Sequence, residues 1–144
     1  MKKEDKEFIE QHLHELKIAV DILSEGVQES GWKKLQLVGQ GAYLANVYSG
    51  YESIMRTLLH VEGIEIPKGE HWHINLLRAA KSRDLITNEM FETLEDMLNF
   101  RNFHVYDYSY KLQEKEVRAR SSEAINTYPI FEKHIREIII KKNS

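Results

Sequence analysis

The sequence predicts an all-α fold, an antiparallel up-and-down four-helix bundle with one short extra helix. Four long segments place apolar side chains at alternating spacings of three and four residues, the period of an amphipathic helix. No segment alternates apolar and polar residues for long enough to form a strand. The connections between the segments are short, which favours antiparallel neighbours. We therefore expect one helical domain over residues 1–144.

The first two helices follow from one apolar stripe each. The first is expected over residues 4–29 and ends before Gly31, and the second over residues 33–62. The first stripe consists of Ile9, Leu13, Leu16, Val20, Leu23 and Val27. The second consists of Leu37, Gly41, Leu44, Tyr48, Tyr51, Met55 and Leu58. Gly41 and Gly50 each weaken the second helix by roughly 1 kcal/mol relative to alanine, or allow a close contact between helices.

A short helix and a third long one are expected after a loop at residues 63–69. The short helix is predicted over residues 70–80, with Glu70 in its first turn. Asp84 or Thr87 can cap the next helix. That helix carries Met90, Phe91, Leu94, Met97, Leu98, Arg101, Val105 and Tyr108.

The last helix is predicted to be interrupted. Its stripe consists of Val117, Ser121, Ala124, Tyr128, Phe131, Ile135 and Ile138. Pro129 lies within it, and proline removes a backbone donor, so the helix should kink or split there. Tyrosine is favoured at protein interfaces, so Tyr48, Tyr51 and Tyr128 could also serve a dimer interface.

Composition excludes several classes of function. The chain has 20 basic and 23 acidic residues, which argues against a general binder of phosphate backbones but leaves room for a local basic site. It has no cysteine, which excludes disulfides, thiolate metal sites and thiol nucleophiles. No apolar run approaches the ~20 residues of a membrane span, and the N-terminus has no signal-peptide core. We expect a cytoplasmic protein that does not enter a membrane.

The histidines do not form a metal site in the predicted helices. His12 and His14 point in opposite directions on a helix, and His71 and His73 could share a metal only in extended backbone. We interpret Trp72 and His73 as packing residues at a helix start, one of them hydrogen-bonded. The sequence also lacks a glycine-rich phosphate loop, so no cofactor is expected.

Residues 99–110 concentrate chemically active side chains. Arg101, His104 and Tyr108 share one face of a helix, because they stand at positions i, i+3 and i+7. An arginine on an otherwise apolar face requires a partner or a function. One interpretation is an aromatic dimer seam with a buried arginine–carboxylate pair. The other is a ribonuclease-like site, in which arginine holds a phosphate and imidazole or phenol handles the proton of a 2′-hydroxyl.

This segment resembles the signature of the HepT-like ribonuclease toxins of the HEPN superfamily. That signature is arginine, four residues, histidine, any residue and tyrosine. Arg101 and Tyr108 match it, Asn102 is a common choice after the arginine, and Tyr106 stands in the histidine position. Two further blocks are similar to family patterns. They are Asn46-Val47-Tyr48-Ser49-Gly50-Tyr51-Glu52 and Gly69-Glu70-His71-Trp72-His73-Ile74-Asn75-Leu76-Leu77.

The resemblance implies an assembly and an activity. The fold would be a HEPN bundle, and the protein a homodimer whose motif helices face each other near the two-fold axis. Such proteins are one half of a toxin–antitoxin pair, and the antitoxin is a minimal nucleotidyltransferase. The toxin cleaves RNA without a metal, here tRNA or mRNA. The antitoxin adds AMP to the motif tyrosine, which by position is Tyr108.

The tyrosine in the histidine position of the signature affects the expected nuclease activity. A phenol with a pKa near 10 is a poor general base at neutral pH, whereas imidazole, with a pKa of about 6.5, is suited to it. Tyr106 therefore predicts a weakened or absent nuclease, unless His104 supplies the imidazole. In an active site Arg101 would hold the scissile phosphate, and Tyr108 would orient the substrate or carry the modification.

The sequence leaves alternatives open for the role of Glu52 and for the function of the protein. Glu52 is either the partner of Arg101 or an exposed surface carboxylate. The first function is the ribonuclease toxin. The second is a catalytically degenerate dimer that binds a minimal nucleotidyltransferase or nucleic acid, and the third is a purely structural bundle.

Overall fold

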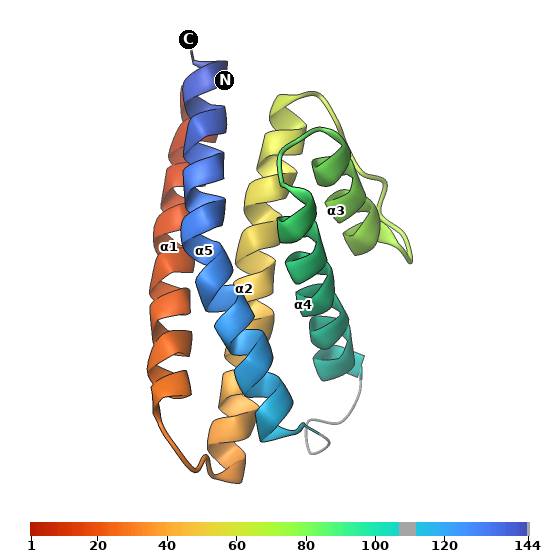
Figure 1. Ribbon diagram of the computed structural model, residues 1–144. Coiled ribbons are helices and arrows are strands. Elements are labelled where there is room, and N and C mark those ends of the chain that lie inside the picture. The colour runs from red at the N-terminus through yellow and green to blue at the C-terminus, as the bar shows by residue number, and fades with distance from the viewer. Residues whose placement is uncertain (107–111, 144) are drawn as a thin grey trace.

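The computed structural model describes residues 1–106 and 112–143 and, for residues 103–106, the backbone alone. In these ranges the chain forms five helices and no strand (Figure 1). The helices are α1 (Lys3–Gln28), α2 (Lys34–Val61), α3 (Trp72–Ser82), α4 (Asn88–Tyr106) and α5 (Glu114–Lys142). The prediction of an all-helical fold is confirmed.

The four long helices lie side by side, and α3 packs outside them against α2 and α4 (Figure 1). Helix α1 contacts α2 and α5, and α4 contacts both α2 and α5. The core between them is built from the predicted stripes, with Ile9, Leu44 and Phe131 among its fully buried side chains. None of the helices in the described ranges is long and apolar enough to cross a bilayer.

Helices α1 and α2 begin and end within one residue of the prediction, but α3 does not. It begins at Trp72, so the expected place of Glu70 in its first turn is wrong. The Trp72 backbone N–H donates to the Gly69 carbonyl at 3.2 Å, and its indole Nε1 donates to the Ile66 carbonyl at 3.1 Å. These bonds fix a turn ahead of the helix and leave Glu70 in the loop.

The structure decides which residue caps α4 and whether Pro129 splits the last helix. Thr87 caps α4, because its hydroxyl accepts the Met90 N–H at 3.2 Å, whereas Asp84 has a φ of 59° in the turn before it. Helix α5 continues through Pro129, so the alternative of two separate helices is wrong. Figure 1 shows its lower half inclined to its upper half.

Three tyrosines face inward rather than outward. Tyr48 and Tyr51 are fully buried and Tyr128 nearly so, so their expected place in a dimer interface is wrong. The Tyr51 hydroxyl donates to the Ala124 carbonyl at 2.9 Å, and the Tyr128 hydroxyl donates to the Leu13 carbonyl at 3.0 Å. All three rings are part of the core, and the hydroxyls of Tyr51 and Tyr128 link separate helices.

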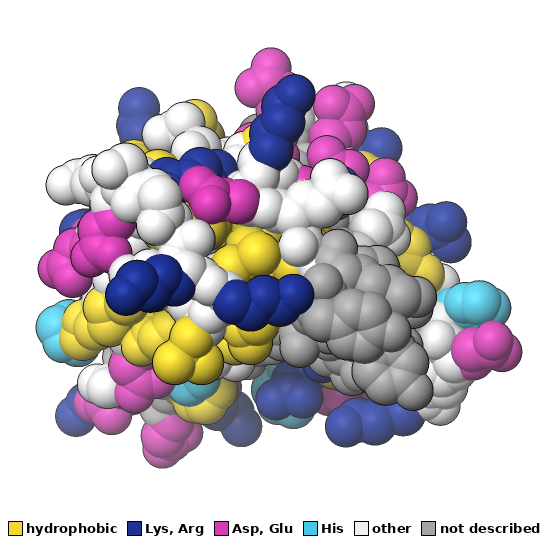
Figure 2. Space-filling view, turned by 90° about the horizontal axis from the view of Figure 1, so that it is seen from below, with side chains coloured by type: hydrophobic (Ala, Val, Ile, Leu, Met, Phe, Trp, Pro, Cys, Tyr) yellow, Lys and Arg dark blue, Asp and Glu magenta, His cyan; other side chains and the backbone are white. Residues whose placement is uncertain are grey.

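One end of the molecule presents apolar side chains to solvent. This is the end at which α2 and α5 begin, and Figure 2 shows hydrophobic side chains lying beside those of lysine and arginine there. Leu35, in the first turn of α2, is 82% exposed.

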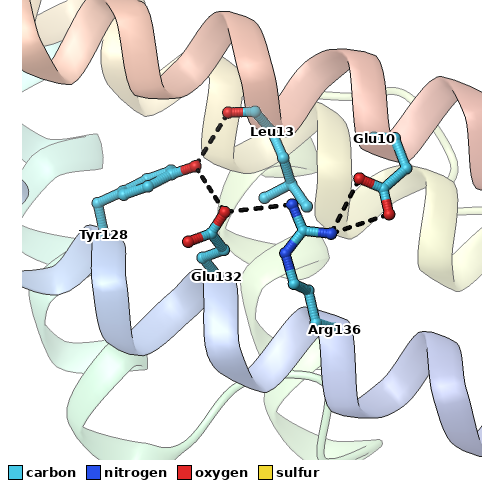
Figure 3. A network of polar contacts seen from close by, with 5 residues as sticks. All are labelled: Glu10, Leu13, Tyr128, Glu132 and Arg136. Atoms are coloured by element: carbon cyan, nitrogen blue, oxygen red, sulfur yellow. Dashed lines mark hydrogen bonds and ion pairs between the residues drawn. The ribbon is translucent and has the colours of Figure 1, made fainter.

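A polar network joins α1 to α5 on the opposite side from α3 and α4 (Figures 1 and 3). The Arg136 Nη1 donates to both carboxylate oxygens of Glu10 at 2.9 Å, and its Nη2 donates to Glu132 at 3.2 Å. Glu132 also accepts from the Tyr128 hydroxyl at 3.4 Å. The network therefore fixes the lateral position of α1 against α5.

Candidate active site

Helix α4 carries the candidate arginine on a turn anchored in the core. Phe100 is buried, and the next two residues, Arg101 and Asn102, are half-buried. Burial is the largest influence on the pKa of the Tyr48 phenol of α2, and the positive charge of Arg101 is the one influence that lowers it.

The buried carboxylate of Glu52 is the centre of a polar network. It accepts a hydrogen bond from the Tyr48 hydroxyl at 2.9 Å. Its Oε2 also lies 2.7 Å from Nδ1 of His73, at the start of α3. Tyr48 and Glu52 are four residues apart and therefore lie on one face of α2.

Tyr48 remains a neutral donor in this network. Burial raises the pKa of its phenol, the Glu52 carboxylate raises it further, and the positive charge of Arg101 lowers it in part. The net direction is upward, so the phenol keeps its proton at any physiological pH. The Tyr48 hydroxyl can therefore donate its hydrogen bond to Glu52 at any physiological pH.

Two expectations for Glu52 need correction. It is buried, so the alternative of an exposed surface carboxylate is wrong. Among the described residues no ion pair joins it to Arg101, because its hydrogen bonds go to His73 and Tyr48. Arg101 is therefore not the ion-pair partner of this carboxylate in the described structure. The interpretation of Trp72 and His73 as hydrogen-bonded residues at a helix start is confirmed.

A cleft of about 350 Å³ lies between the start of α3 and the outer face of α4. His73 and Asn102 both line it, from opposite sides. The other lining residues are Glu70, His71, Ile74, Glu95, Leu98 and Asn99. The cleft therefore brings the Glu52-bound imidazole and the residue next to Arg101 to one surface.

The remaining candidate residues belong to the end of α4 and beyond. His104 and Tyr106 are in its last turn by backbone, and their side chains lie outside the description. Tyr108 lies outside the described residues. Their roles, and their sharing of a face with Arg101, stay predictions.

No pattern in the sequence indicates that His73 contacts Glu52. The two residues are 21 positions apart on different helices. The signal that was available is local: Tyr48 and Glu52 stand one helical turn apart, the spacing of a hydrogen-bonded pair. Within the described ranges, no three acidic or histidine side chains converge as a metal ion would require.

Comparison with known families settles the relationship of the chain. The family model described as HepT-like protein matches residues 40–141. The chain belongs to the HepT-like family of the HEPN superfamily. No curated protein and no solved structure matches it.

The hydrogen-bonded network of Tyr48, Glu52 and His73 lies within the range that the family model matches, and so does Arg101. Helix α1 precedes that range, which covers residues 40–141. The site is thus built from the family's own portion of the chain, and α1 completes the core around it.

Proposed function

We propose that this HepT-like protein is the toxin of a toxin–antitoxin pair and a metal-independent endoribonuclease acting on tRNA or mRNA. The observation that carries the proposal is that Arg101 is half-buried on α4 directly before Asn102, which lines the same cleft as His73. A guanidinium presents a planar fork of donors that fits the oxygens of a phosphodiester. A single partly buried arginine is therefore a suitable phosphate holder in a chain with a net charge of −3.

The signature residues have assigned roles in this proposal. Arg101 holds the scissile phosphate, with Asn102 supporting it, and His104 is the base or acid of the motif helix. Tyr106 stands in the histidine position of the signature and weakens the nuclease. Tyr108 orients the substrate or is the residue to which the antitoxin adds AMP.

The same proposal covers the assembly. A single up-and-down HEPN bundle of the four long helices is supported by the contacts of α1 with α2 and α5 and of α4 with α2 and α5. Two copies form a homodimer with their motif helices near the two-fold axis. The partner is a minimal nucleotidyltransferase in the cytoplasm, and the apolar and basic end shown in Figure 2 has a composition suited to a protein contact.

A second function is favoured by Tyr106. A HEPN dimer without an effective base would serve as a binding module for the nucleotidyltransferase. This alternative predicts a stable complex of the two proteins without RNA cleavage.

The deciding experiment is RNA cleavage in EDTA by protein expressed without an antitoxin. The substrates are total tRNA and an mRNA transcript, and the variants are Arg101→Ala, His104→Ala and Tyr106→His. Wild type should cleave, and Arg101→Ala should lose about 100-fold or more, the usual scale for removing a preorganised donor to a transition-state charge. Arg78→Ala, which truncates an exposed arginine of α3, is the matched control.

Tyr106→His tests the alignment itself. Introduction of an imidazole at the signature position should raise the cleavage rate, because proton transfer by a positioned base contributes about 10²–10⁴-fold. Expression of wild type should arrest growth, and Arg101→Ala should relieve the arrest. Toxicity that is indifferent to Arg101→Ala contradicts the enzyme, and absence of wild-type cleavage favours the binding module.

A further inference from the structure

We propose that His73, oriented by Glu52, is a catalytic imidazole of this site and transfers the proton of the RNA 2′-hydroxyl. The inference rests on the proposed ribonuclease function and adds to it a residue outside the signature. The structural observation behind it is a histidine held by a buried carboxylate at the edge of the cleft that Asn102 lines from α4.

The hydrogen bond to Glu52 determines which nitrogen is available. Nδ1 of His73 lies 2.7 Å from a carboxylate oxygen, so Nδ1 carries the proton and donates it. In the neutral imidazole Nε2 is then left with a lone pair, as a general base requires. A carboxylate that fixes the tautomer and orientation of an imidazole is the arrangement found in acid–base catalysis generally.

The exposure of the two side chains also fits this role. The His73 side chain is 32% exposed, whereas that of Glu52 is 11% exposed. The imidazole can therefore reach a substrate while its carboxylate partner stays inside the protein. A purely structural pair would gain nothing from leaving the ring open to the cleft.

Two contacts restrict the movement of the pair. The Tyr48 hydroxyl donates to the same oxygen, Oε2 of Glu52, that His73 contacts. The Trp72 ring meets the His73 ring edge-on, with centroids 4.6 Å apart and planes at 74°. Since the Trp72 indole is itself bonded to the Ile66 carbonyl, the imidazole is supported by groups that are fixed in turn.

A second histidine–carboxylate pair among the described residues shows what a solvated pair looks like. His60 and Glu65 are 2.6 Å apart, but their side chains are 66% and 76% exposed. His60 lines a different cleft, formed with Phe8 and Trp72 rather than with α4. It shares the pairing of His73 but neither the buried partner nor the proximity to α4, and it is therefore the matched control.

The reaction needs no co-reactant other than water. The 2′-oxygen forms a bond to phosphorus and its proton passes to Nε2 of His73. The bond from phosphorus to the 5′-oxygen breaks, and that oxygen takes a proton from water. The imidazolium returns its proton to the hydroxide so formed, which leaves a 2′,3′-cyclic phosphate and a 5′-hydroxyl end. Arg101 binds the non-bridging oxygens of the phosphate throughout.

The test is single-turnover cleavage of total tRNA in EDTA by wild type, His73→Ala, His60→Ala and Arg101→Ala. His73→Ala should cleave about 10²–10⁴-fold more slowly, as loss of a general base does. Imidazole added to the buffer should restore part of that rate in His73→Ala and none in Arg101→Ala. His60→Ala should match wild type.

The outcomes separate this inference from the proposed function. If wild type cleaves and Arg101→Ala does not, but His73→Ala is as fast as wild type, the ribonuclease stands and the inference is wrong. A folded His73→Ala that is inactive and not rescued by imidazole assigns His73 a structural role and also overturns the inference. If wild type cleaves no RNA, the proposed function fails and the catalytic role of His73 fails with it.

A spectroscopic measurement tests the geometry without cleavage. Nitrogen-15 NMR of labelled histidine should show His73 protonated at Nδ1 in wild type and no longer confined to that tautomer in Glu52→Ala. Addition of a non-cleavable 2′-deoxy oligonucleotide should shift the Nε2 signal of His73 but not that of His60. Protonation at Nε2 in the free protein, or an unchanged His73 signal, contradicts the inference.

Discussion

Buried tyrosines are the residues whose ionisation the fold opposes most strongly. Burial raises the pKa of Tyr128 to about 12, with the Glu132 carboxylate adding to the shift. The pKa values of Tyr48 and Tyr51 are raised as well, chiefly by burial. Each of these phenols is neutral in the folded chain at a pH where it would ionise in the unfolded chain.

This difference predicts loss of stability in alkali. Below the unfolded pKa of about 10 both states keep the proton, and above it only the unfolded state loses it. The free energy of unfolding should therefore fall as the pH rises from 10 towards 12, by up to about 1.4 kcal/mol per pH unit for each such tyrosine. Urea unfolding at pH 8, 10 and 11 measures the slope.

Tyr128→Phe isolates one contribution. It loses the hydrogen bond to the Leu13 carbonyl at every pH, so its stability at pH 8 should be lower than that of wild type. Its decline between pH 10 and 11 should nevertheless be shallower. Equal slopes for the two proteins would contradict the assignment of part of the decline to Tyr128.

At the residue scale the roles of Arg101, Asn102 and Glu52 in a site stay predictions. What the structure adds is that the buried Glu52 carboxylate is hydrogen-bonded to Tyr48 and to His73. The actual partners of Glu52 were missed, because a hydrogen bond between α2 and α3 depends on how the helices pack. Helical periodicity fixes which residues share a face but not which face a neighbouring helix presents.

Helix boundaries were predictable where they depend on local chemistry. The ends of α1 and α2 follow from the apolar stripes and the residues between them, and Thr87 caps α4 through its own hydroxyl. The start of α3 was displaced by two residues because the Trp72 indole bonds to a loop carbonyl, a contact that periodicity does not contain. Pro129 is exposed, and a proline on the outer face of α5 is accommodated without a second helix.

Two glycines of α2 give a matched test at the scale of the helix. A Cβ added at Gly39 meets nothing within 4 Å, whereas one added at Gly50 would lie 2.9 Å from Cδ1 of Leu16 on α1. Gly39→Ala should therefore raise the free energy of unfolding by about 1 kcal/mol, the difference in helix propensity. Gly50→Ala should gain clearly less, because the Leu16 side chain must move.

Urea unfolding of the two variants beside wild type decides the comparison. An equal gain for both substitutions would show that Gly50 is not needed for the approach of α1 to α2. The expectation that Gly41 or Gly50 allows a close helix contact is met at Gly50.

For the whole molecule, the fold class followed from the sequence because four stripes of helical period leave few ways to bury their apolar faces. Which helices lie next to each other depends on contacts between residues far apart in the sequence. Helix α5 contacts α1 across most of the chain, through bonds such as that from Arg136 to Glu10. No pattern in the sequence of either helix predicts that the other helix is its neighbour.

The homodimer is the prediction that belongs to this scale. Light scattering at micromolar concentration should give twice the 17.0 kDa of one chain. Since Tyr48, Tyr51 and Tyr128 are buried within one protomer, the dimer must form through other residues. The exposed Leu35 offers a check, because Leu35→Lys should leave the mass unchanged if the motif helices make the interface. A mass of 17 kDa for wild type contradicts the dimer.

The two chain termini lie together at one end of the bundle, and α4 ends towards the other (Figure 1). Anything fused to either terminus therefore emerges away from the end of the motif helix. Affinity tags or fluorescent reporters should be tolerated at both ends without obstructing the proposed RNA site. The same proximity suits a circular permutant, with the old termini linked and new ones opened between α1 and α2.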